Sequence, residues 1–472
     1  MTPLNQLRPE NRKFSDGLLI GITFGLYFLF GGAKVNDLNH AFVILYTIFT
    51  FLRYVNNLGH TINIFDFLTF YSALDTLLSP MISYIYFDKN EYLARLWGAY
   101  MRVPEDRYFG FLIPANLALF AGVHLFFNKR RMNARKYVEN AKTYVANKSK
   151  VGFVFVGIGI FGTQLKNVVP DSLTFIFYLL GMLTYVGGFY LYFSVKKRRA
   201  LILSLLFAAF FFQAVQIGLF GEVAMFAVMA ASVILPQYRV RFLTKLLFFV
   251  IAFSGVIIVQ SVKTEYRYIT WNGKGADMYE GQGNFSIFSD LVADRVLDPS
   301  KIFNERSLFY LNRRFNQGFL VAAAMYYVPR VAPYAEGETI WRSMAAVIVP
   351  RFLWPDKPEA GGRDNLTRFL GIKKRMSYSM NIGPYGEGYG NFGPIGGTIF
   401  IFIYSLLISF FLDMTLKKAL KFHSLIIWIP LLFYYVLTVE TDILTTINSM
   451  VKTILFILVI YWASKKYLHV DI

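Results

Sequence analysis

Residues 244–262 read TKLLFFVIAFSGVIIVQSV, an apolar run in which Lys245 is the only charged side chain. An α-helix of about 20 predominantly apolar residues is long enough to cross the hydrocarbon core of a bilayer. In such a helix all backbone groups are hydrogen-bonded within the segment, as an apolar solvent requires. The run therefore predicts a transmembrane helix.

Comparable apolar stretches recur along most of the chain. They lie near residues 17–33, 41–58, 64–87, 107–127, 150–168, 171–194, 200–219, 221–237, 393–413, 424–439 and 446–464. With 56% hydrophobic and only 16% charged residues among 472, the chain has more apolar surface than a soluble core of this size would bury. The pattern predicts an all-α polytopic membrane protein with about 12 transmembrane helices.

The basic residues indicate the orientation of these helices. A net charge of +19 would suggest nucleic-acid binding in a soluble protein, but here the positive charges form short clusters between the apolar runs, so no nucleic-acid partner is expected. Clusters on one side of the predicted membrane contain Lys13, Lys129–Lys150, Lys196–Arg199, Arg239–Lys245, Lys417–Lys421 and Lys465–Lys466. Short basic loops stay in the cytoplasm, so both termini are expected there. No small-residue cleavage site follows the polar N-terminus, so the first helix is expected to be retained.

Three regions follow from this topology: residues 1–262 with nine transmembrane helices, a large extracytoplasmic loop at 263–392, and residues 393–472 with three more helices. The loop is too long for a simple connection, and its aromatic and glycine residues predict an ordered, partly helical unit. We expect the function to reside in it.

The segment SLFYLNRRFNQG, residues 307–318, contains two adjacent arginines at the start of a probable helix. Guanidinium groups hold phosphate oxygens bidentately and stay charged at physiological pH, so Arg313 and Arg314 are candidates for binding a lipid pyrophosphate. The alternative is an interfacial role, with the side chains extended toward lipid headgroups or paired with Glu305.

A proline-rich turn follows in VIVPRFLWPDKP, residues 347–358, with Arg342 a few residues upstream. Prolines end the preceding helix and fix a rigid turn. The turn would hold Arg351 and Lys357 together, with Trp354 as a flat face for a sugar ring. The alternative is a structural elbow at the membrane interface, where tryptophan and arginine are common.

The glycine-rich stretch EGYGNFGPIGG, residues 387–397, leads into the tenth predicted helix. Glycines permit unusual backbone angles and close approach, so we expect a binding turn at the helix entrance in which Glu387, Tyr389 and Asn391 face an acceptor hydroxyl. The alternative is a packing site where Glu387 neutralises an arginine.

No cofactor or metal is expected. The chain has no cysteine, which excludes disulfides and thiolate metal sites, and its five histidines have no metal-ligand spacing. No Walker loop and no serine nucleophile elbow occurs in the sequence. These absences argue against nucleotide hydrolysis and nucleotide-sugar transfer.

The turn VIVPRFLWPDKP and the helix entrance EGYGNFGPIGG, with the helix count and a large late outer loop, resemble the Wzy-type O-antigen polymerases, the oligosaccharide repeat unit polymerases. The resemblance implies a GT-C-like polymerase or ligase fold in the bacterial inner (plasma) membrane. The implied reaction joins repeat units carried on undecaprenyl pyrophosphate, and the implied partners are this lipid-linked oligosaccharide, membrane lipids and a chain-length regulator.

The resemblance also assigns roles to the candidate residues. Catalysis is expected from Arg314, Arg351 and Glu387. Substrate binding is expected from Arg313, Arg342, Trp354, Lys357, Tyr389 and Asn391.

Two other functions fit the same features. One is an O-antigen ligase of the same superfamily, which transfers a finished glycan to another acceptor. The other is a transporter or flippase for lipid-linked oligosaccharides, which would carry polar residues along its helices. Because polar residues concentrate in the outer loop here, the sequence favours an enzyme.

Overall fold

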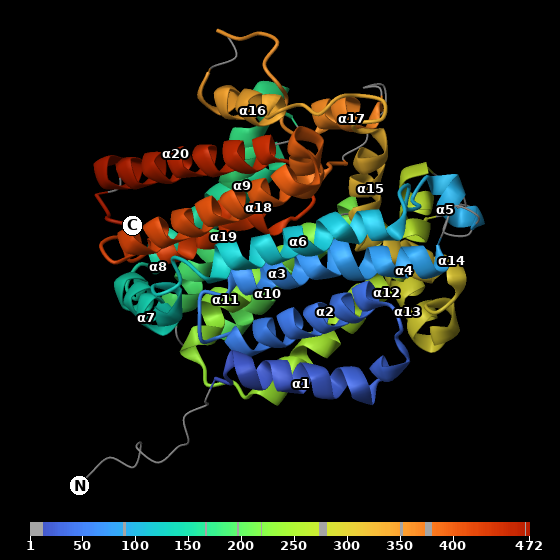
Figure 1. Cartoon of the computed structure of the whole chain (residues 1–472). Coiled ribbons are helices and arrows are strands. Elements are labelled where there is room, and N and C mark those ends of the chain that lie inside the picture. Colours follow the sequence, from blue (N-terminus) through green and yellow to red (C-terminus); the bar gives the residue numbers. More distant parts are fainter. Residues whose placement is uncertain are drawn as a thin grey trace.

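All the regular elements in the described part of the chain are helices. The computed structural model describes residues 13–87, 91–165, 168–195, 198–218, 220–272, 281–349, 353–372, 380–467 and 469–472. Figure 1 shows many of the long helices stacked with similar axes in one bundle. The sequence prediction of an all-α protein is confirmed.

The first part of the chain forms α1 (Asp16–Leu29), α2 (Leu38–Asn57), α3 (Ile64–Ala73), α4 (Ser79–Tyr86), α5 (Tyr92–Trp97), α6 (Glu105–His124), α7 (Ala134–Val145), α8 (Ser149–Leu165), α9 (Asp171–Ser194), α10 (Arg199–Ile217), α11 (Gly221–Ile234) and α12 (Phe242–Asn272). The rest forms α13 (Asn284–Leu297), α14 (Glu305–Arg314), α15 (Gly318–Tyr327), α16 (Glu338–Ile348), α17 (Arg363–Leu370), α18 (Gly383–Ala419), α19 (Leu425–Leu437) and α20 (Ile443–Tyr467). A π-helical turn, Leu74–Leu78, joins α3 to α4.

Five helices are long and apolar enough to cross a membrane: α2, α9, α12, α18 and α20. The segments Arg131–Val145 and Ser149–Leu165 would add a sixth span if they were taken together, although they meet at 94°. The remaining predicted stretches also fall on helices, several of which are apolar but only 10 to 17 residues long. Each of the twelve stretches is therefore helical, and several could span a membrane.

The helix α12 exposes a large apolar surface. Leu247, Phe248 and Ile251 are 59%, 71% and 62% exposed, and only 6% of the most apolar window of the helix is buried. An apolar surface of this extent is rare on a soluble monomer, because water would drive it into another contact. The exposed face of α12 therefore supports a membrane environment.

Close helix contacts in the bundle depend on small residues. A Cβ atom on Gly187 of α9 would lie 2.7 Å from the carbonyl oxygen of Gly152 on α8, so only glycine permits this approach. Gly122 of α6 packs equally closely against Ser405 of α18. Such small-residue contacts are typical of helix pairs in membranes, where close van der Waals packing replaces the hydrophobic effect.

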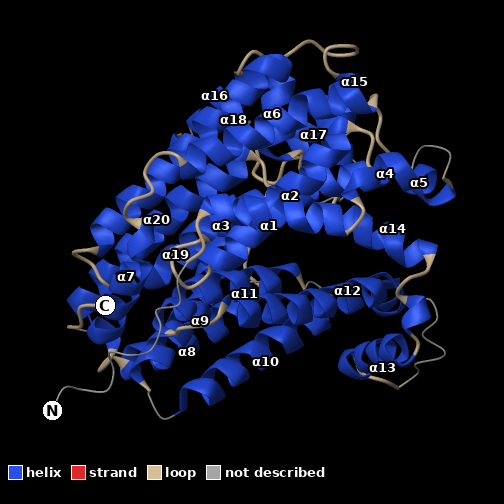
Figure 2. Cartoon of the chain, turned by 60° about the horizontal axis from the view of Figure 1, so that its bottom comes forward, coloured by secondary structure: helices blue, strands red, loops and turns tan. Residues whose placement is uncertain are grey.

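The predicted outer loop is largely helical and rests on the bundle. In its described part, helices α13 to α17 pack against long helices: α14 contacts α12, α15 contacts α18, and α16 contacts α20. Figure 2 shows α13 beside the end of α12. The helix α12 itself continues to Asn272, ten residues past the expected boundary at 262.

The sequence predicted a binding turn in the glycine-rich stretch before residue 393. This prediction is wrong, because the stretch forms the first part of α18. The helix begins at Gly383 and is broken at Gly393, whose backbone angles are φ 70° and ψ −167°. Glycine adopts these angles readily, and Pro394 then starts the next helical segment. The break coincides with the predicted start of the tenth transmembrane helix.

Candidate functional site

Polar side chains gather at the end of the bundle where α14 to α17 lie. We distinguish two neighbouring sets. The Arg314 group consists of Asp75, Lys263, Arg267, Arg314, Gln317 and Glu440. The Glu387 group consists of Thr339, Asn365, Glu387 and Asn391. The turn VETD between α19 and α20, residues 439–442, contacts both groups.

Arg313 and Arg314 lie in the last turn of α14, not at the start of a helix as the sequence analysis expected. The helix begins instead after Asn304, whose side chain accepts a hydrogen bond from the backbone N–H of Ser307 at 2.8 Å. Asn at this position caps a helix well, and Arg in the last turn is favoured by the negative end of the helix dipole. These local signals set the register of α14.

Glu440 connects Arg314 to the neighbouring helix α15. Its Oε2 atom accepts a hydrogen bond from Gln317 Nε2 at 2.6 Å and lies 3.4 Å from Arg314 Nη1. The Arg314 and Glu440 side chains are 30% and 31% exposed. The ion pair is therefore half-buried and reaches the surface of the protein, which distinguishes it from the fully buried polar contacts nearby.

Asp75 lies behind this pair in the π-helical turn. Its side chain is fully buried and accepts a hydrogen bond from the backbone N–H of Gln317 at 3.3 Å. Its second carboxyl oxygen has no hydrogen-bond partner among the described residues. π-helical turns frequently occur at functional sites, because they displace one residue from the regular helical ladder.

Two further cations approach Arg314 from α12. Lys263 and Arg267 are four residues apart and so lie on the same face of that helix, and both interact electrostatically with Arg314. The Arg267 guanidinium donates hydrogen bonds to the carbonyl oxygen of Gly218 at 2.6 and 3.0 Å and stacks 4.4 Å from the Trp271 ring. Two guanidiniums and the Lys263 amine, from two helices, thus lie near Arg314 and its half-buried partner Glu440.

Glu387 is fully buried and hydrogen-bonded on both carboxyl oxygens. Oε1 accepts from the Thr339 hydroxyl at 3.2 Å, and Oε2 accepts from the backbone N–H of Ile443 at 3.2 Å. The Asn365 side chain also bonds to it. Among the ion pairs of the described residues none involves Glu387. This carboxylate joins α16, α17, α18 and α20, and its role in positioning an acceptor stays a prediction.

Asn391 and Tyr389 extend this network along α18. The Asn391 side chain donates to Thr339 Oγ1 at 2.7 Å and accepts from the backbone N–H of Gly337 at 3.0 Å. The Tyr389 hydroxyl accepts a hydrogen bond from Arg107 Nη2 at 3.0 Å. Both side chains therefore hold the first part of α18 in place against α16 and α6.

Burial changes the proton affinity of two groups at the edge of this network. Burial raises the pKa of Asp442, which caps α20 through the backbone N–H of Thr445 at 3.2 Å. Burial, together with the hydroxyl of Tyr389, raises the pKa of Tyr334 to about 12. Tyr334 therefore stays protonated at neutral pH and can act only as a neutral hydrogen-bonding group.

The other predicted site residues lie apart from these groups or outside the described residues. Arg351 falls outside the described residues. Arg342 is exposed on α16 and pairs with Glu338 of the same helix at 3.4 Å. Lys357 donates to the carbonyl oxygen of Val349 at 2.9 Å, and Trp354 is half-buried nearby. The structure thus brings Arg314 to a carboxylate and gathers Glu387 with Asn391.

The site residues predicted from the sequence do not include Asp75, Lys263, Arg267 or Glu440. Two signals were present: Asp75 is a charged residue within an apolar stretch, and Glu440 belongs to an acidic connection that the sequence predicted to lie outside. Lys263 and Arg267 follow the apolar run of α12 directly, a position that sequence alone attributes to interfacial anchoring.

Comparison with known proteins gives one match. The family model DUF8712, a domain of unknown function, matches residues 81–461, a range that includes every residue of both groups except Asp75. No curated protein and no solved structure matches the chain significantly.

Proposed function

The chain belongs to the DUF8712 family, a domain of unknown function, and from the chemistry of its Arg314 group we propose that it is a membrane-embedded glycosyltransferase. It polymerises oligosaccharide repeat units carried on undecaprenyl pyrophosphate, as the resemblance to the Wzy-type O-antigen polymerases implies. The proposal includes twelve transmembrane helices of GT-C-like type in the bacterial inner membrane, both termini in the cytoplasm, and the Arg314 group at the outer face.

One observation carries this proposal: Lys263 and Arg267 of α12 converge on Arg314 of α14, which pairs with the half-buried carboxylate of Glu440. The guanidiniums of Arg267 and Arg314 outnumber the half-buried carboxylate of Glu440 and give this part of the group an excess of positive charge. Two guanidiniums, with the Lys263 amine beside them, suit a pyrophosphate, whose charge rises when its bond to the sugar breaks. The Glu440 carboxylate suits the acceptor hydroxyl.

In the proposed reaction, the oxygen of an acceptor sugar hydroxyl attacks the anomeric carbon of the donor glycan. The bond between that carbon and the pyrophosphate oxygen breaks, and the undecaprenyl pyrophosphate leaves with the electron pair. Glu440 orients the hydroxyl and takes its proton, while Arg314, Lys263 and Arg267 bind the leaving group. No redox partner and no nucleotide takes part in this balance.

The position of the cations on α12 fits a lipid-linked substrate. Lys263 and Arg267 lie in the last third of a helix whose apolar window is exposed or half-buried at almost every residue. A ligand with its pyrophosphate at these cations would extend its isoprenoid chain along that apolar surface, where lipid is the solvent. A water-soluble sugar phosphate would make no use of this surface, which favours a lipid-linked donor.

The test is an activity assay on the protein purified in detergent with its lipid-linked repeat unit. The native protein should give a ladder of longer lipid-linked glycans on a gel. Arg314→Ala should lower the rate about 100-fold, the usual cost of losing one charge-stabilising donor. Arg306→Ala is the matched control, because Arg306 is exposed on the same helix and lies only near the Tyr310 ring.

Equal rates of polymerisation by the Arg306→Ala and Arg314→Ala proteins would show that the Arg314 group does not take part in the reaction. Transfer of glycan to an added acceptor lipid without a ladder would identify a ligase. Movement of intact substrate across vesicles, with no new bond formed, would identify a transporter. Glu440→Gln separates proton transfer from binding: the proposal requires loss of turnover with retained binding of the donor.

A further inference from the structure

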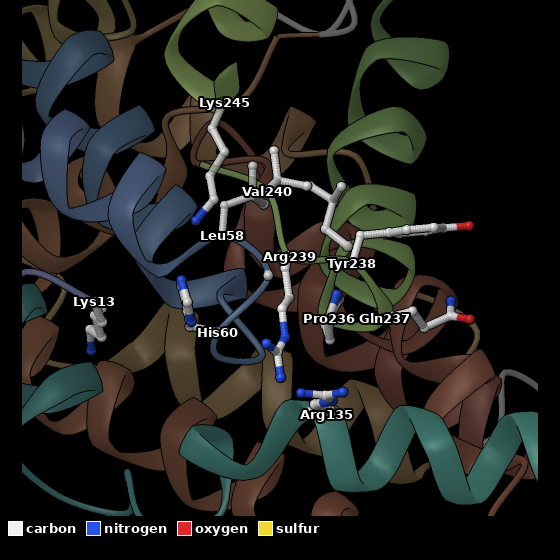
Figure 3. A pocket seen from close by; sticks show the side chains of 12 residues that line it. Lys13, Leu58, His60, Arg135, Pro236, Gln237, Tyr238, Arg239, Val240 and Lys245 are labelled. Atoms are coloured by element: carbon white, nitrogen blue, oxygen red, sulfur yellow. The ribbon is translucent and has the colours of Figure 1, made fainter. Parts of the chain in front are cut away.

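A second polar feature lies at the opposite end of the bundle from the Arg314 group. A cavity of about 330 Å³ opens between the residues before α1, the connection from α2 to α3, the helix α7 and the connection from α11 to α12. Figure 3 shows its lining side chains. Five of them are basic or can become so, and none of the described lining residues is Asp or Glu: Lys13, His60, Arg135, Arg239 and Lys245.

Lys245 is the buried member of this set. Its side chain is only 6% exposed, and among the described residues it donates one hydrogen bond, to the carbonyl oxygen of Asn56 at 3.3 Å. An ammonium group has three donors, and a buried charge is costly unless an anion compensates it. The neutral carbonyl supplies no such charge, so the Lys245 ammonium is suited to an anion in the cavity.

The nearest carboxylates are engaged elsewhere. Asp66 and Asp16 influence Lys13 electrostatically, but both pair with Arg53, at 3.0 and 3.4 Å. One of these carboxylates balances Arg53 and the other offsets Lys13, so Arg135, Arg239 and Lys245 still leave the cavity positive.

Two arginines occupy the open side of the cavity. Arg135 and Arg239 are exposed, come from α7 and from the connection to α12, and form no ion pair with a described carboxylate. Figure 3 shows their guanidinium groups turned toward one another. Like charges that face one another repel unless an anion lies between them, and two guanidiniums match the oxygens of a phosphate.

His60 adds a donor without adding charge. Burial and the neighbouring Lys245 and Lys13 lower the pKa of its imidazole, so the ring is neutral at physiological pH. A neutral imidazole donates one hydrogen bond and does not increase the repulsion among the cations. The site therefore combines two fixed guanidiniums, a buried ammonium and a neutral donor.

We infer that this cavity is a binding site for a phosphate-bearing anion, separate from the Arg314 group. Its volume fits a phosphorylated headgroup or a diphosphate, and its donors come from four parts of the chain that folding brings together. The anion comes either from a membrane phospholipid or from a water-soluble phosphate compound. In both cases the bound anion ties the residues before α1 to α7 and α12.

The test measures the melting temperature of the purified full-length protein with two probes. Inorganic pyrophosphate represents a soluble phosphate, and nanodiscs that contain phosphatidylglycerol are compared with nanodiscs of phosphatidylcholine alone. At least one probe should raise the melting temperature of the native protein. The double variant Arg135→Gln, Arg239→Gln should weaken binding of that probe about tenfold or more, since both side chains are exposed and the fold does not depend on them.

The matched control is Lys136→Gln, Arg241→Gln. Lys136 and Arg241 are exposed, lie next to Arg135 and near Arg239 in the sequence, and do not line the cavity. Their substitution removes the same two positive charges. The control should bind as the native protein does. Equal losses in the two double variants would mean diffuse electrostatic attraction, and no effect of either probe on the native protein would leave the cavity without a phosphate ligand; each result overturns the inference.

A stabilising effect of pyrophosphate alone assigns a soluble ligand, and an effect of phosphatidylglycerol alone assigns a lipid headgroup. Lys245→Met provides an independent check, because methionine keeps the length of the side chain and removes the buried charge. This variant should lose the response to the effective probe and should be no less stable than the native protein without it. The measurement involves no catalysis, so it does not depend on the proposed glycosyltransferase activity.

Discussion

Glu387 accepts hydrogen bonds on both carboxyl oxygens from donors on separate helices. A buried donor that loses its acceptor costs about 1–3 kcal/mol, so the effect of a substitution depends on what the new side chain can still accept. This gives Glu387 a structural role that the glycine-rich sequence around it does not indicate. It also makes two substitutions at this position informative.

Glu387→Ala should lower the free energy of unfolding by about 3 kcal/mol, because the Thr339 hydroxyl and the Ile443 N–H both lose their acceptor. Glu387→Gln keeps one acceptor oxygen and should be milder. Thermal denaturation in detergent measures both. If the Glu387→Gln protein folds but no longer produces the ladder of longer glycans, Glu387 has the catalytic role predicted from the sequence. If the ladder is unchanged, the role of Glu387 is structural.

Asp442 provides a pH test at the same scale. Burial raises its pKa, so between the ordinary value of about 3.9 and the higher folded value the folded protein holds a proton that the unfolded chain has lost. This group therefore contributes less stability as pH rises through that window. Asp442→Asn keeps the cap of α20 and cannot ionise.

The Asn variant should melt at a higher temperature than the native protein near pH 7, and the difference should shrink as the pH falls toward 4. Thermal melts at several pH values check this. A difference that does not vary with pH would show that the carboxyl of Asp442 keeps its ordinary proton affinity.

At the scale of elements, the apolar periodicity located each of the twelve long helical segments, because a run of about 20 apolar residues has few alternatives to a helix. It did not indicate that α18 begins ten residues early. Gly386, Gly388 and Gly390 lower the intrinsic helix propensity there, and tertiary contacts override it. The Asn304 cap shows the reverse case: a local signal for the start of α14 lies in the sequence and gives the correct position of Arg314.

The break in α18 leads to a prediction about Gly393. Its backbone angles, φ 70° and ψ −167°, belong to a region that only glycine occupies readily, so Gly393→Ala should cost about 2 kcal/mol of stability. Gly255→Ala on α12 is the matched control, because a Cβ atom there meets nothing within 4 Å. That control should be neutral or slightly stabilising. Equal melting temperatures for the two variants would contradict the strained angle at Gly393.

At the scale of the whole molecule, the sequence could not reveal which polar residues meet. Arg314 and Glu440 are separated by 126 positions, and Gln317 and Asp75 by 242. No periodicity relates residues so far apart, and contacts of this kind depend on how the helices pack. The basic cavity illustrates the same point: Lys13, Arg135, Arg239 and Lys245 served in the sequence only as markers of orientation, and folding brings them to one cavity.

The proposed orientation can be tested directly because the chain has no cysteine. We would introduce single cysteines at Ser300, at the end of the bundle that holds Arg314, and at Met132, just before α7. The two should react differently with a membrane-impermeant maleimide in cells whose outer membrane has been permeabilised. Both sites are exposed. Ser300→Cys should be labelled while the inner membrane is intact, and Met132→Cys should be labelled only after the inner membrane has been permeabilised. The opposite pattern would invert the topology and place the Arg314 group in the cytoplasm.

The bond from the Ile443 N–H to Glu387 also concerns the order in which the chain is made. Its two ends are 56 positions apart, and translation at about 5–20 residues per second separates their synthesis by on the order of 3–11 s. During that interval the carboxylate has left the ribosome without its last donor. A chain truncated before α20 lacks the donor for this contact, so Glu387 can join α16 and α18 to α20 only after α20 has been made.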